Sequence, residues 1–288
     1  MIRIERGLSA LAGEYDAFIV DLWGVLHDGV RAFPAAVDCL ETLHAQGKRI
    51  VILSNAPRRA AVVRERNAEL GIAARLCDAV VSSGEDAWRH LHGRPDAWYR
   101  ALGRHCFHLG PERDFGMRAG LDYDFVAAAA ADFVLNTGAL GPDDEAGDYD
   151  PMLRELAGRG LRMICANPDL EVVRGGRREI CAGAVAARYE ALGGEVRYHG
   201  KPHPEIYRAC FAAVPQVPRA RIAAIGDSLR TDIAGANAAG IDGIFVSGGL
   251  QGEELGVDAE GNADPARLRA LCAEERHWPK AALPALRW

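Results

Sequence analysis

The chain has 288 residues, 49% of them apolar and 26% charged, which is enough for one large domain or two of ordinary size with buried cores. Its 34 basic and 40 acidic residues give a formal net charge of −6 without a Lys/Arg tract, which argues against nucleic acid and against a membrane surface as partners. Residues 1–16 lack a signal-peptide pattern and no apolar run approaches the roughly 18 residues that span a membrane, so we expect a cytoplasmic protein.

Short apolar runs alternate with helical patterns at both ends of the chain. Consecutive apolar residues predict buried strands, and helical stretches that open at proline or close at glycine predict helices. The predicted elements, in chain order, are strand 17–21, helix 34–46, strand 49–54, helix 57–70, strand 78–81, strand 221–226, helix 229–239 and strand 243–246. This order predicts an α/β fold with a doubly wound, Rossmann-like parallel sheet and functional groups at the carboxyl ends of its strands.

The middle of the chain has a second set of elements. These are, in chain order, strand 105–109, strand 132–136, helix 149–159, strand 162–165 and helix 180–192. We therefore expect residues 87–197 to form a large α/β domain inserted into a core made of residues 1–86 and 198–288. After the last predicted strand, the tail begins with a predicted helix at 265–275.

Polar residues end two of the predicted strands in the first part of the chain. Asp21 follows a buried strand directly, where a carboxylate can act as a nucleophile or a metal ligand, although it can also cap a turn. Ser54 and Asn55 end the next strand. A hydroxyl and backbone N–H groups there could hold a phosphoryl oxygen, although both are ordinary turn residues.

The second part of the chain supplies a lysine and two more carboxylates. Lys201 lies in a Gly-Lys-Pro segment before a helix and is one of only three lysines, so its ammonium group is a candidate to neutralise a carboxylate or a phosphate. Asp227 follows a predicted strand and Asp232 lies five residues later. Two carboxylates that bracket a helix start suit Mg²⁺, and they also suit capping of that helix.

The order of these motifs resembles the haloacid dehalogenase superfamily of phosphohydrolases. The motifs are Asp-x-x-Gly-Val from Asp21, Ser-Asn at 54–55, Gly-Lys-Pro at 200–202 and Gly-Asp-Ser-x-x-x-Asp at 226–232. The stretches at 165–169, 175–176, 182–184 and 226–240 are similar to the class IIA, NagD-like subgroup. In that subgroup a large cap is inserted between the Ser and Lys motifs, where the second domain is predicted.

The resemblance implies a role for each matching residue. Asp21 would attack phosphorus and form an aspartyl-phosphate, while Lys201 neutralises charge and orients Asp21. Ser54 and the backbone of Asn55 would hold the phosphoryl group. The ligands of Mg²⁺ would be Asp21, the backbone carbonyl of Trp23, Asp227 directly and Asp232 through water. The substrate would be a small phosphorylated metabolite, and homodimerisation through the cap is possible by resemblance.

One position departs from the phosphatase pattern. Two residues after the nucleophile, where the phosphatases carry an Asp that protonates the leaving group, this chain has Trp23. An indole cannot transfer protons near neutral pH, so turnover of unactivated esters needs another acid. His27, Asp28 and the predicted cap residue Asp169 are candidates, each of which is also explained as a turn or surface residue.

Three other functions compete with a Mg²⁺-dependent phosphohydrolase. Carbon–halogen hydrolases of the superfamily carry an aromatic residue at this position, but they need no metal, which leaves Asp227 and Asp232 without a purpose. Phosphonate hydrolases use a cap lysine, and residues 87–197 contain none. A catalytically impaired phosphoanion- and metal-binding protein is the third. For the phosphohydrolase, residues 167–176 are the candidate substrate-contacting loop.

Overall fold

Two parallel β-sheets organise the chain. The computed structural model describes residues 2–288. The first sheet has seven strands in the order β1 (Arg3–Ile4), β14 (Ala281–Leu283), β13 (Asp242–Val246), β12 (Ile222–Gly226), β2 (Ala17–Val20), β3 (Arg49–Ser54) and β4 (Ala79–Ser82). The second has five, in the order β11 (Glu195–Tyr198), β8 (Arg162–Cys165), β7 (Phe133–Asn136), β5 (His105–Leu109) and β6 (Asp124–Phe125). The predicted α/β fold class, a parallel core sheet with a separate α/β unit, is confirmed.

Helices cover both faces of the larger sheet because its central strands are apolar on both sides. In β2, Phe18 and Val20 pack in one cluster with α1 (Pro34–Ala45), whereas Ala17 and Ile19 pack in another with α7 (Pro204–Ala213). A strand buried on both faces reads as a continuous apolar run, which is the pattern that predicted it.

The remaining helices of residues 2–288 include five that were predicted, with shifts at some of their ends, and three that were not. The predicted ones are α2 (Ala60–Glu69), α5 (Asp150–Gly158), α6 (Ala182–Ala191), α8 (Ala234–Ala239) and α10 (Pro265–Glu275), and the others are α3 (Ser83–Gly93), α4 (Ala97–Arg100) and α9 (Gly252–Leu255). The predicted helix at 229–239 is a π-helical turn, Leu229–Ile233, followed by α8. None of the helices within residues 2–288 has the length and apolarity needed to cross a membrane.

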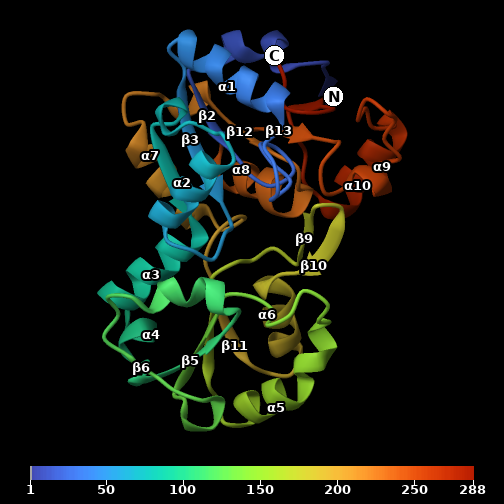
Figure 1. The fold of residues 1–288 in the computed structure, drawn as a ribbon. Coiled ribbons are helices and arrows are strands. Elements are labelled where there is room, and N and C mark those ends of the chain that lie inside the picture. Colours follow the sequence, from blue (N-terminus) through green and yellow to red (C-terminus); the bar gives the residue numbers. More distant parts are fainter. Residues whose placement is uncertain (1) are drawn as a thin grey trace.

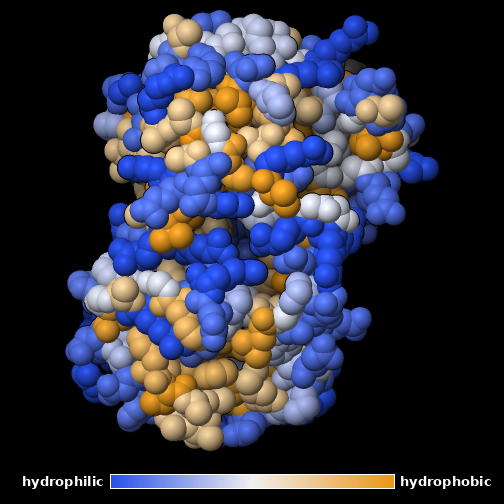
Figure 2. Space-filling view, in the orientation of Figure 1, coloured by the Kyte–Doolittle hydropathy of each residue, from blue (hydrophilic) through white to orange (hydrophobic). Residues whose placement is uncertain are grey.

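The two sheets lie at opposite ends of the molecule, with both chain termini beside the seven-stranded one (Figure 1). The helix α3 leads from one part to the other, and an antiparallel hairpin, β9 (Glu171–Arg174) and β10 (Arg177–Ile180), lies between them. Hydrophilic residues cross the surface at this level (Figure 2). The division at residues 86/87 and 197/198 stays a prediction; α3 spans its first boundary and β11 its second.

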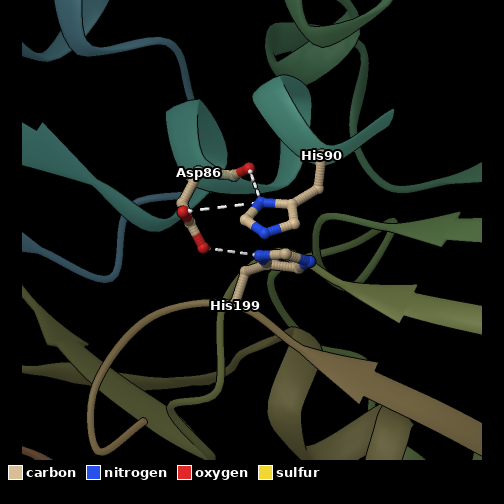
Figure 3. A group of neighbouring side chains, drawn as sticks. All are labelled: Asp86, His90 and His199. Carbon is tan, nitrogen blue, oxygen red and sulfur yellow. Dashed lines mark hydrogen bonds and ion pairs between the residues drawn. The ribbon is translucent and has the colours of Figure 1, made fainter. Parts of the chain in front are cut away.

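A chain of hydrogen bonds joins α3 to the segment that leads back to the larger sheet (Figure 3). His199 follows β11, and its Nδ1 donates to Asp86 Oδ2 at 2.6 Å while its Nε2 accepts from the Tyr99 hydroxyl. His90 donates from Nδ1 to the Asp86 carbonyl at 2.8 Å, and its ring lies 4.7 Å from that of His199. Burial lowers the pKa of His199 and favours this neutral form. The chain fixes the backbone two residues before Lys201.

Candidate active site

The carboxyl ends of three adjacent strands, β12, β2 and β3, meet at one edge of the larger sheet. Asp227 follows β12, Asp21 follows β2, and Ser54 with Asn55 ends β3. Lys201 reaches the same place from the loop before α7, and Asp232 from the π-helical turn. All six predicted side-chain positions line one cavity of about 180 Å³ and are buried, none exposing more than 7% of its surface.

Lys201 is the positive centre of this cavity. Its Nζ lies 2.5 Å from Asp21 Oδ1 and 2.6 Å from Asp232 Oδ1. Burial lowers the pKa of Lys201, but the carboxylates of Asp21 and Asp232 outweigh it and raise that pKa well above the ordinary value. Lys201 is therefore a permanent cation that holds Asp21 at the open end of its strand.

Three carboxylates beside Lys201 fit a divalent metal ion. Asp21, Asp227 and Asp232 each offer an oxygen, and these oxygens lie within 4.8 Å of one another. Burial and their mutual repulsion raise the pKa of Asp227 well above its ordinary value and that of Asp232 to about 6. A cation among hard oxygen donors would remove this repulsion. Gly24, where φ is +71°, leaves space for the Asp227 carboxylate, because a Cβ at this position would lie 1.9 Å from Asp227 Oδ2.

The capping explanation for the aspartates holds in part. Asp232 Oδ2 accepts from the Ser228 backbone at 3.1 Å, so it does stabilise the start of its own turn. Its Oδ1 faces Lys201 at the same time. Asp227 Oδ2 accepts from the Leu250 backbone N–H at 2.7 Å, and Leu250 lies in the loop after β13, not in the turn that follows Asp227. Asp232 thus has both a structural and a site-facing oxygen.

The side chain of Asn55 joins three parts of the site. Its Oδ1 accepts from the Lys201 backbone N–H at 2.8 Å, and its Nδ2 donates to the Lys201 carbonyl at 3.0 Å and to Asp169 Oδ1 at 2.8 Å. Sequence reasoning assigned a role only to its backbone. The Ser54 hydroxyl accepts from Ala56 N at 3.2 Å, which leaves its own proton available to the cavity.

Trp23 packs under the β9–β10 hairpin. Its indole makes an edge contact with the His27 ring at 5.1 Å, and the Arg174 guanidinium of β9 lies 4.9 Å from its centre. Gly29 has φ +82°, and a Cβ there would lie 2.2 Å from the indole. Gly175 N donates to the Asp28 carbonyl at 3.3 Å. The indole thus serves as a platform for the hairpin.

Two of the three candidate acids near Trp23 are engaged in its turn. His27 Nδ1 accepts from Gly29 N at 3.0 Å, and burial lowers the pKa of His27 to about 4. The Asp28 carboxylate accepts from two backbone N–H groups, which lower its pKa. The third, Asp169, lines the same cavity as Asp21 and Lys201.

The cavity has further walls. Val172 and Val173 of β9 line it and belong to the predicted substrate-contacting loop 167–176, whereas Phe33 and Thr231, which also line it, were not predicted. The signal that could have located the hairpin is the Gly175-Gly176 pair between two short β-favouring runs, since such pairs are typical of tight hairpin turns.

Comparison with known proteins places this site in a family. The family described as haloacid dehalogenase-like hydrolase matches residues 18–119, and one described as HAD-hydrolase-like matches residues 198–268. Human chronophin is 32% identical over 261 residues, covering 81% of this chain and 82% of that protein. The chain belongs to the haloacid dehalogenase-like hydrolases, in class IIA.

Other relatives of this hydrolase match most of its length. D-glycerol 3-phosphate phosphatase of Mycobacterium tuberculosis is 28% identical, covering 88% of this chain and 69% of that protein. The crystal structure of a haloacid dehalogenase-like hydrolase from Brucella suis is 35% identical, with a TM-score of 0.84 and coverage of 98% of this chain and 100% of that one. The p-nitrophenyl phosphatase of Archaeoglobus fulgidus, at 20% identity and a TM-score of 0.70, shares the fold.

The two family matches divide the site of this hydrolase between them. The first covers Asp21, Trp23, Ser54 and Asn55. The second covers the remaining predicted residues, Lys201, Asp227 and Asp232. Asp169 and the β9–β10 hairpin lie outside both matches, in the part of the chain that supplies the other wall of the cavity.

Proposed function

We propose that this hydrolase is a Mg²⁺-dependent phosphatase that acts on a small phosphorylated metabolite through an aspartyl-phosphate intermediate. The observation that carries the proposal is the position of Lys201 Nζ, between the Asp21 and Asp232 carboxylates in a buried cavity. Two of the relatives are phosphatases by name, one of D-glycerol 3-phosphate and one of p-nitrophenyl phosphate, which supports the same reaction class.

In the proposed reaction Asp21 attacks the phosphorus of the substrate. The attack breaks the phosphorus–oxygen ester bond and forms an acyl phosphate on Asp21, which water then hydrolyses to regenerate the carboxylate and release phosphate. Lys201 neutralises charge on the phosphoryl oxygens and orients Asp21, while the Ser54 hydroxyl and the Asn55 backbone position the group. Phosphoryl transfer depends mainly on such positioning and charge neutralisation.

The proposed ligands of Mg²⁺ are Asp21, the Trp23 backbone carbonyl, Asp227 and, through water, Asp232. When bound, the ion supplies additional positive charge to the phosphoryl oxygens. The buried carboxylate oxygens of this set support the assignment, since one lysine alone opposes three carboxylates. The same set disfavours a carbon–halogen hydrolase, which needs no metal.

We further propose the division of the molecule into a catalytic core, residues 1–86 and 198–288, and a cap, residues 87–197. The cap side of the cavity is apolar at Val172 and Val173, and the cavity volume of about 180 Å³ suits a metabolite. A closed cap excludes water and protein-sized substrates. Trp23, in this proposal, occupies the position of the usual acid, so the proton for the leaving group has another source.

The test is release of inorganic phosphate from a panel of alkyl phosphates and from p-nitrophenyl phosphate, with Mg²⁺ and with a chelator. The Asp21→Asn variant is the control, because it keeps the shape of the side chain and removes the nucleophile. We expect Mg²⁺-dependent release that the variant abolishes while its circular dichroism spectrum is unchanged. Undiminished release by Asp21→Asn would refute the aspartyl-phosphate. Binding of Mg²⁺ without release from either ester class would favour a phosphoanion-binding protein.

A further inference from the structure

Asp169 is held between the two parts of the molecule. It lies between β8 and β9, and its backbone N–H donates to Asn167 Oδ1 at 2.9 Å while its carbonyl accepts from Gly183 N at 3.1 Å. Its side chain points the other way, into the cavity that holds Asp21 and Lys201, and its Oδ1 accepts from Asn55 Nδ2 at 2.8 Å. One cap carboxyl is thus aimed at the catalytic residues and fixed there by a core amide.

Two other carboxyls beside Asp169 on the cavity wall have partners of a different kind. Asp28 receives two backbone N–H groups at 2.8 and 2.9 Å. Glu171 forms an ion pair with Arg178. The backbone hydrogen bonds lower the pKa of Asp28, which makes it a poor proton donor. Asp169 accepts from a neutral amide, and burial raises the pKa of Asp169 against the opposing effects of Lys201 and of the hydrogen bonds from Asn55 and Thr231.

We propose that Asp169 is the general acid and base of this phosphatase, a catalytic residue delivered by the cap in place of one on the core. The proposal rests on the proposed function. As Asp21 attacks phosphorus and the ester bond breaks, the protonated Asp169 gives its proton to the leaving alkoxide, which departs as an alcohol. The resulting carboxylate then takes a proton from the water that attacks the acyl phosphate. Phosphate leaves, and both Asp21 and the protonated Asp169 are restored.

The packing of Trp23 couples this acid to cap closure. Arg174, five residues after Asp169, lies over the indole, and Gly175 donates to the Asp28 carbonyl of the same turn. The hairpin that follows Asp169 therefore rests on Trp23 when Asp169 is in the cavity. Because position 23 is a tryptophan, the core has no carboxyl there. The indole instead supports the hairpin that follows Asp169, the residue proposed to replace that acid.

The discriminating variant is Asp169→Asn, which retains an oxygen to accept from Asn55 and cannot transfer a proton. A p-nitrophenolate leaving group is stable without protonation, whereas an alkoxide is not. We expect the first-turnover burst of p-nitrophenol to be retained, with slow release of phosphate after it. For the best alkyl phosphate of the wild-type enzyme, we expect the first turnover itself to slow by roughly 10²–10⁴-fold.

Two controls separate the role of Asp169 from general damage. Glu171→Gln removes a second carboxyl from the same wall, and it should leave the aryl-to-alkyl ratio of first-turnover rates as in the wild type. Adding Trp23→Asp to Asp169→Asn returns a carboxyl to the core, and it should restore part of the alkyl turnover. This gain would not follow if Asp169 only shaped the loop.

The outcomes of this experiment differ from those that test the phosphatase itself. If wild-type enzyme releases phosphate from neither ester class, the proposed function fails. If wild-type enzyme turns over both esters and Asp169→Asn slows both first turnovers equally, the phosphatase stands and the role of Asp169 is overturned. A wild-type enzyme that cleaves the aryl ester but no alkyl phosphate of the panel would also overturn it.

Discussion

Stabilisation of this protein by Mg²⁺ should depend on pH, because the proposed ligands include carboxyl groups with raised pKa values. The pKa of Asp232 is about 6 in the folded metal-free protein, against an ordinary value of 3.8. The stability that this carboxyl contributes is fully present below pH 3.8 and is lost as the pH rises through about 6. Mg²⁺ binds the ionised form, so it must displace the proton at pH 5 but not at pH 7.5.

The magnitude follows from one displaced proton. Between pH 5 and pH 7.5, a group with a pKa of about 6 changes the apparent affinity for Mg²⁺ about tenfold, or about 1.4 kcal/mol. Asp227, whose pKa is raised further, adds in the same direction. At a Mg²⁺ concentration well above both apparent dissociation constants, the extra free energy of unfolding conferred by Mg²⁺ should therefore be larger at pH 7.5 by at least this amount.

Urea denaturation at both pH values, with a fixed Mg²⁺ concentration or a chelator, measures this quantity. The buried His27 and His108, whose pKa values are about 4, also change stability in this range, but equally with and without Mg²⁺, so they cancel in the difference. Asp232→Asn should reduce the pH dependence, and Asp38→Asn, an exposed carboxyl on α1, should not. Equal stabilisation by Mg²⁺ at the two pH values would refute the metal assignment.

Two further substitutions test the hydrogen bonds that support the site. Asn55→Ala removes the partners of the Lys201 N–H and carbonyl and of Asp169, and we expect it to lower the free energy of unfolding by about 1–3 kcal/mol and to lower phosphatase activity. Unchanged stability in urea would show that Asn55 does not brace Lys201. His199→Phe removes the hydrogen bonds that His199 makes with Asp86 Oδ2 and with the Tyr99 hydroxyl, and it should also cost about 1–3 kcal/mol, more than Tyr99→Phe. Equal losses in the two variants would contradict the hydrogen-bonded chain.

The sequence predicted the core of this fold well because its central strands are buried on both faces. The strands β2, β3 and β12 read as continuous apolar runs. Because neighbouring strands of this sheet are parallel, the polar residues that follow their carboxyl ends lie at the same edge. Asp21 and Lys201 are 180 residues apart, so their contact follows from topology and not from any local pattern. The resemblance to a known family supplied that topology.

The cap side of the site was harder to predict. Residues 167–176 were expected as one loop, but β9 begins inside it at Glu171 and places Val172 and Val173 against the cavity. The strand β9 has only four residues, Glu-Val-Val-Arg, which do not alternate between polar and apolar, and so short a pattern does not distinguish a strand from a loop. The bridging role of the Asn55 side chain depends on Lys201 and Asp169, both distant in sequence, and no local signal carries it.

The choice of lysine at position 201 is itself informative. The chain has only three lysines among its 34 basic residues, so arginine supplies nearly all other positive charge. An ammonium group is a compact point charge with three donors, whereas a guanidinium is a planar fork suited to bidentate pairing with one carboxylate. Lys201 faces two carboxylates at once, at 2.5 and 2.6 Å, in a buried space. An arginine would have to displace Asp21 or Asp232 to enter it, which accounts for a lysine at this buried position between two anions.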